Sequence, residues 1–97
     1  MADIEPRVGM VVASRMGRDK DKVFMVAAIV NPEFVMLADG KYRKLASAKL
    51  KRWKHVKPVG KALEGIAAKL ETGKKVFDSE LYSALKSAVD GLQKADN

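Results

Sequence analysis

The sequence predicts a mainly β protein, a small antiparallel barrel of about five strands followed by a pair of α-helices packed on it. Up to residue 57, short runs rich in branched and aromatic residues alternate with tight-turn residues. After Pro58, apolar residues recur at helical spacing. We therefore divide the chain into a tail at 1–6, a barrel at 7–58 and a helical hairpin extension at 59–97.

The first two predicted strands cover about 8–14 and 22–30 and are joined by a charged turn. The turn, MGRDKDK at 16–22, is too polar to bury. Gly17 is the one residue in it that can adopt a positive φ without strain. The second strand is apolar on both faces, whereas a half-exposed strand alternates apolar with polar residues. We therefore expect another element to cover its outer face.

The remaining predicted strands are short and closely spaced: a third at 34–38, a fourth at 41–45 and a last one within 50–57. Pro32 presets φ for the turn before the third strand. Asp39 and Gly40 are expected to form a type I′ hairpin turn, because this turn needs positive φ at both central residues. Ala46-Ser47-Ala48 serves as a connector to the last strand.

Two amphipathic helices are predicted after Pro58. Their apolar stripes are Leu63, Ile66, Ala67 and Leu70 in the first, and Leu81, Leu85, Val89 and Leu92 in the second. Gly73 is expected to end the first helix as a left-handed cap. Asp78 or Ser79 opens the second, with Phe77 and Tyr82 placed for a hydrophobic staple. Neither stripe can be buried alone, so we expect both helices to pack on the barrel.

The net charge of +7 is concentrated in one segment. Residues 1–40 and 62–97 each balance to −1, whereas 41–61 hold nine basic and no acidic side chains. Such a stripe favours a polyanionic partner. The alternative is a solvated lysine-rich face that keeps the protein soluble.

The segment 7–33 resembles a KOW motif, a strand–turn–strand unit of 27 residues with a glycine, here Gly17, at its eleventh position. VGMVVASRMGRDKDK, LADGKYRK, KRWKHVKP and GKKVFDSEL resemble small bacterial KOW-domain proteins, a group similar to a large-subunit ribosomal protein of eukaryotic and archaeal type. Such proteins often carry GRDKGK in this turn. The present chain has GRDKDK, with Asp21 at the position of the second glycine. The resemblance implies an SH3-like barrel that binds RNA, most of all ribosomal RNA or the large ribosomal subunit.

The residues independently permit phosphate binding, since lysine and arginine can each meet a phosphate. The predicted RNA-binding residues are Arg15, Gly17, Arg18, Lys20, Lys22, Lys41, Tyr42, Arg43, Lys44, Lys49, Lys51, Arg52 and Lys54. Tyr42 is the better candidate for stacking on a base. Trp53 could also stack, but we favour a place in the core for it.

An enzyme is not indicated. The chain has no cysteine, a single histidine (His55), and no phosphate-cradling glycine pattern or useful acidic pair. We expect no cofactor and no metal. The missing cysteine, the missing apolar run of about 18 residues and an N-terminus without a signal-peptide layout predict a cytoplasmic protein with no membrane association.

Two alternatives to RNA binding stay open. The C-terminal helices could present an apolar groove to a protein partner in the translation or transcription machinery. KOW domains of transcription elongation factors contact polymerase, so the resemblance allows this too. A DNA-binding helix-turn-helix is weaker, because the second helix carries Asp78, Glu80 and Asp90 against Lys86 and Lys94.

Overall fold

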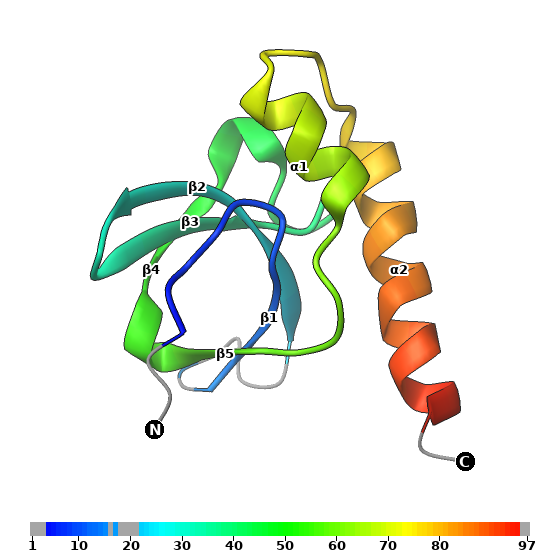
Figure 1. The fold of residues 1–97 in the computed structure, drawn as a ribbon, viewed down its shortest axis with the longest axis horizontal. Helices are drawn as coiled ribbons and strands as arrows, with labels where there is room; N and C mark the ends of the chain where they lie inside the picture. The colour runs from blue at the N-terminus through cyan, green and yellow to red at the C-terminus, as the bar shows by residue number, and fades with distance from the viewer. Residues whose placement is uncertain (1–3, 16, 18–21, 96–97) are drawn as a thin grey trace.

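The computed structural model, which describes residues 4–15, 17 and 22–95, is a five-stranded antiparallel sheet with two helices packed after it (Figure 1). The strands are β1 (Val11–Ser14), β2 (Val23–Asn31), β3 (Phe34–Ala38), β4 (Lys49–Arg52) and β5 (Val56–Pro58), in the order β4-β3-β2-β1-β5. The helices are α1 (Glu64–Glu71) and α2 (Asp78–Ala95), and η1 (Leu45–Ser47) and η2 (Trp53–His55) are single 3₁₀ turns. The predicted fold class is confirmed.

The sheet curls because β2 is long and irregular. Its pairing with β3 shifts register between Val26 and Ala28 and again between Ile29 and Asn31. Such bulges bend a strand and increase its twist. Figure 1 shows the resulting barrel-like curvature, with the two outermost strands, β4 and β5, joined directly by η2.

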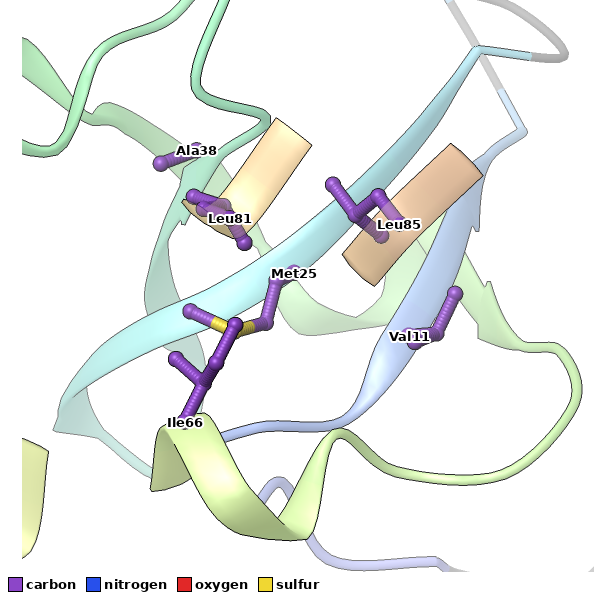
Figure 2. Packing of buried hydrophobic residues seen from close by; sticks show 6 residues of the cluster. All are labelled: Val11, Met25, Ala38, Ile66, Leu81 and Leu85. Atoms are coloured by element: carbon purple, nitrogen blue, oxygen red, sulfur yellow. The ribbon is translucent and has the colours of Figure 1, made fainter. Parts of the chain in front are cut away.

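Two hydrophobic clusters lie on opposite faces of the sheet. The inner cluster consists of Val12, Phe24, Val26, Val35, Leu37 and Val56. The outer cluster consists of Val11, Met25, Ala38, Ile66, Leu81 and Leu85, which join the sheet to both helices (Figure 2). Neighbouring strand residues alternate between the clusters, as pleating requires.

The expected cover for the outer face of β2 is therefore present, and it is the helical pair. It reaches only the first half of the strand. The second half is exposed, with Ile29 and Val30 at 42% and 55% of their full accessibility. The first register shift, between Val26 and Ala28, lies where these two halves meet.

The predicted fourth strand at 41–45 and the Asp39-Gly40 hairpin are both wrong. Asp39 Oδ1 accepts hydrogen bonds from the backbone N–H groups of Lys41 (2.9 Å) and Arg43 (2.8 Å). The Arg43 carbonyl in turn accepts from the N–H groups of Asp39 (2.9 Å) and Gly40 (3.1 Å). The aspartate side chain thus closes a compact loop at 39–43 in place of a two-residue turn. The chain then forms η1, where a connector was expected.

The single strand expected within 50–57 is instead two strands separated by η2. The Trp53 N–H donates to the Glu33 carbonyl at 2.7 Å, which holds this 3₁₀ turn against the β2–β3 turn. The turn resets the alternation of side chains. Leu50 is 54% exposed and Val56 is buried, although an unbroken strand would place both on one face.

The first helix begins at Glu64, one residue after the start of its predicted apolar stripe, and ends as predicted. Gly73 adopts φ 77°, and the Lys74 N–H donates to the Lys69 carbonyl at 2.8 Å, which confirms the left-handed cap. Ile66 is buried, while Leu63 and Leu70 pack around the outer cluster. Among the described residues, no helix is long and apolar enough to cross a membrane.

The second helix begins at Asp78, one of the two predicted starts. Asp78 Oδ1 accepts a hydrogen bond from the Leu45 N–H at 2.7 Å, which ties the start of α2 to η1. Phe77 and Tyr82, expected to form a staple, are both exposed. Leu81 and Leu85 are buried as predicted and Val89 is half-buried, while the Leu92 side chain lies outside the described part.

Two glycines with positive φ let the helices approach the barrel closely. Gly9 (φ 94°) lies against Ala67 of α1, and Gly40 (φ 84°) lies against the Asp78 carbonyl in the first turn of α2. A Cβ on either glycine would overlap these atoms. Gly9 also sits in a turn before β1, which is why this strand begins at Val11 rather than near residue 8.

Candidate nucleic-acid interface

The predicted basic turn is only partly described. Arg18 and Lys20, with the neighbouring Asp19 and Asp21, lie outside the described residues. Gly17 has the positive φ expected of it, 84°. Arg15 and Lys22, which flank the turn, are both exposed.

Lys22 and the 39–43 loop meet at one end of the barrel. Lys22 directly precedes β2, the loop directly follows β3, and these strands pair with Met25 opposite Ala38. Antiparallel pairing thus brings together residues about 20 positions apart in sequence. Because Gly40 packs on α2, the same arrangement brings Tyr82 to this end.

Tyr42 is the centre of this group and is 71% exposed. The Nζ atoms of Lys22 and Lys41 each lie 5.3 Å from the centroid of its ring. Lys41 Nζ also lies 5.4 Å from the ring centroid of Tyr82. We call Lys22, Lys41, Tyr42 and Tyr82 the Tyr42 platform.

The chemistry of the Tyr42 platform suits a nucleotide. An exposed cation–π contact contributes about 0.5–1 kcal/mol. Stacking of a base on an aromatic ring contributes about 1–3 kcal/mol. A base can therefore replace a lysine over the Tyr42 ring, and the released ammonium group can bind the adjoining phosphate.

The rest of the basic stripe is divided between the loop that follows β3 and the strand β4. Arg43 and Lys44 are exposed in the loop beside Tyr42. Lys49 and Lys51 are half-buried on β4. The Arg52 guanidinium, also on β4, lies 5.1 Å from the ring centroid of Phe34, its pairing partner on β3.

Lys54 belongs to a second site, which lies at η2. Its walls come from the N-terminal segment, β2, the β2–β3 turn, η2 and β5, and they enclose a groove of about 860 Å³. We call it the Trp53 groove, and the residues that line it are Ile4, Glu5, Pro6, Arg15, Ile29, Asn31, Pro32, Trp53, Lys54, Val56, Lys57 and Pro58. Of the predicted RNA-binding residues, Arg15 and Lys54 lie here.

Trp53 is half-buried between the inner cluster and this groove. Its Nε1–H donates to the Ile4 carbonyl at 2.8 Å, so the indole has its polar partner inside the protein. Trp53 therefore packs against the core, as favoured, and also lines the groove. The groove is not predicted from the sequence, because residues 1–6 are expected to form a tail, and its single sequence signal is a tryptophan within the basic run.

His55 occupies the same 3₁₀ turn, and its carbonyl accepts a 2.7 Å hydrogen bond from the Arg15 N–H. Burial, and then the positive charges of Lys54, Lys51 and Arg52, lower the pKa of the His55 imidazole below its ordinary value. The histidine is therefore neutral near pH 7 and contributes no cation to this region in the absence of a polyanion.

No protein-family model matches this chain, and no curated protein matches it at a significant level. The resemblance to KOW proteins thus rests on the motifs themselves. Among the described residues, no group of three or more His, Cys, Asp or Glu side chains could hold a metal ion.

Proposed function

We propose that this protein is a non-catalytic RNA-binding protein that acts on the ribosome. The observation that carries the proposal is the Tyr42 platform, an exposed aromatic ring with two lysine ammonium groups at 5.3 Å. Single-strand nucleic-acid sites combine these features, a ring for the base and cations for the backbone.

The surrounding charge supports a polyanionic partner. Arg43 and Lys44 lie beside the platform and are exposed, and the segment 41–61 as a whole holds no acidic residue. Each phosphate that such cations neutralise releases counterions, so affinity should fall steeply with salt. RNA shape and backbone contacts, rather than base edges, would supply most of the recognition.

The ribosome is proposed from the resemblance of residues 7–33 to a KOW motif. That resemblance favours ribosomal RNA, in the large subunit or its precursors, and a cytoplasmic location. A protein partner in the same machinery is the alternative.

The first test reverses the charge of the loop. We expect Lys41→Glu, Arg43→Glu and Lys44→Glu together to weaken RNA binding by at least tenfold and to reduce the slope of log affinity against log salt by about 0.7 per lost phosphate contact. The matched control reverses Lys74, Lys75 and Lys86, three exposed lysines outside the stripe. An equal loss of RNA affinity in both variants would mean that only the net charge matters, and the loop would then not be the RNA-binding surface.

The second test asks about the ribosome. Lysate is sedimented through sucrose gradients at low and high salt, and the protein is followed by immunoblot. Co-migration with the large subunit, released by salt and absent for the loop variant, is expected. Protein that stays at the top at low salt would exclude the ribosome, and a protein complex that survives nuclease would favour the protein-partner alternative.

A further inference from the structure

The Trp53 groove has an apolar floor and a cationic rim. Ile29, Trp53 and Val56 supply apolar surface from three separate elements. Arg15, Lys54 and Lys57 line the same groove and are exposed, against one acidic residue, Glu5. This charge balance fits an anionic ligand with an apolar, flat part.

The polar groups of the groove are already oriented. The Trp53 indole N–H is bonded to the Ile4 carbonyl, so the surface that the indole can offer is its ring. The Asn31 carboxamide oxygen accepts the N–H groups of Glu33 (2.8 Å) and Phe34 (3.0 Å). Asn31 can then offer a ligand its amide N–H₂, a donor suited to the acceptor atoms of a base.

We propose that the Trp53 groove holds an unpaired base of single-stranded RNA, with the flanking phosphates on Arg15, Lys54 and Lys57. This inference rests on the proposed function and extends it, because it adds a second contact and a preference for unpaired nucleotides. A duplex keeps its bases stacked inside, so it could place phosphates at the rim but no base against Trp53.

The experiment uses the full chain, in which Trp53 is the only tryptophan and therefore reports directly on the groove. An oligouridylate of about eight nucleotides, within the usual size of a single-strand site, is titrated while tryptophan emission and the anisotropy of a labelled copy are recorded. An abasic strand with the same number of phosphates is the control ligand. We expect the oligouridylate to quench Trp53 and the abasic strand to leave its emission unchanged.

A pair of adjacent positions on β2 provides matched variants. Ile29 lines the groove and Val30 does not, and both are exposed enough to accept a charge. Ile29→Glu should weaken the quenching titration about tenfold, which lies within the range for one stacked base. Val30→Glu, with the same added charge, should change it less than twofold, and thermal melts verify that both variants fold.

The outcomes separate this inference from the proposed function. Oligouridylate that raises anisotropy without changing Trp53 emission would overturn the groove site and leave RNA binding in place. No anisotropy change with any RNA would overturn the proposed function itself. Quenching by an oligoglutamate peptide that oligouridylate cannot displace would overturn the inference in favour of an acidic protein segment.

Discussion

The Tyr42 platform and the Trp53 groove present aromatic rings in opposite ways. The Tyr42 ring is 71% exposed on a loop, and the residues around it are lysines and a second tyrosine. Trp53 is half-buried, bonded to the N-terminal segment, and surrounded by apolar walls with cations at the rim. Both rings belong to the same basic stripe of sequence, separated by η1 and β4.

If both sites bind RNA as we propose, this difference predicts a different role for each. An exposed ring with lysine ammonium groups beside it suits backbone attraction with tolerant stacking, because the long, flexible lysine side chains can follow the phosphates. A half-buried ring in a preformed groove loses little freedom when a ligand binds, so it suits discrimination between paired and unpaired nucleotides. Substitutions at Gly40, Tyr42 and His55 test this comparison.

The largest effect is expected at Gly40, which holds the Tyr42 loop against α2. Gly40→Ala places a side chain at positive φ and against the Asp78 carbonyl, so we expect a loss of about 2–4 kcal/mol in the free energy of unfolding, measured with urea. Gly65→Ala is the control, because a Cβ there meets nothing within 4 Å, and it should stabilise α1 by up to about 1 kcal/mol. An unchanged midpoint for Gly40→Ala would contradict the close packing.

A smaller effect is expected at Tyr42. Tyr42→Ala should lower RNA affinity by about 1–3 kcal/mol, the contribution of one stacked base, while oligouridylate still quenches Trp53. Tyr42→Phe keeps the ring and should bind nearly as well as the wild type. If Phe and Ala are equally weak in a filter-binding assay, the hydroxyl is responsible and the stacking role is wrong.

The smallest effect is expected from His55. Burial and the neighbouring cations lower the pKa of its imidazole in the folded state, so the unfolded chain binds this proton more readily. Stability is therefore lost as pH falls below the ordinary value of 6.5 towards the lowered folded pKa, and it is retained above 6.5. His55→Gln should flatten this part of the stability profile in urea titrations at several pH values.

RNA binding should act in the opposite direction on the same group. Phosphates near Lys54 and Arg52 would raise the pKa of the His55 imidazole, so binding should tighten modestly on acidification from about pH 7.5 to 5.5. The His55→Gln variant should lose that pH dependence. A pH profile identical to the wild type would place the phosphates away from η2.

The sequence alone determined the features that depend on near neighbours in the chain. Apolar runs rich in branched and aromatic residues identified β2 and β3, helical spacing identified α1 and α2, and Gly73 and Asp78 marked helix ends. The two apolar faces of β2 predicted a cover on the sheet, which the helices supply. These patterns result from local sterics and burial, so they can be identified in the sequence without the structure.

The tertiary structure alone decided the loop at 39–43, the break at η2 and the Trp53 groove. An Asp-Gly pair can form either a two-residue hairpin turn or a loop closed by the aspartate side chain. Here the closed loop forms, and Gly40 within it contacts α2. The break in the last strand goes with the bond from Trp53 to Glu33. The groove depends on the bond between Trp53 and Ile4, 49 residues apart, and no local pattern in the sequence encodes a partner at that distance.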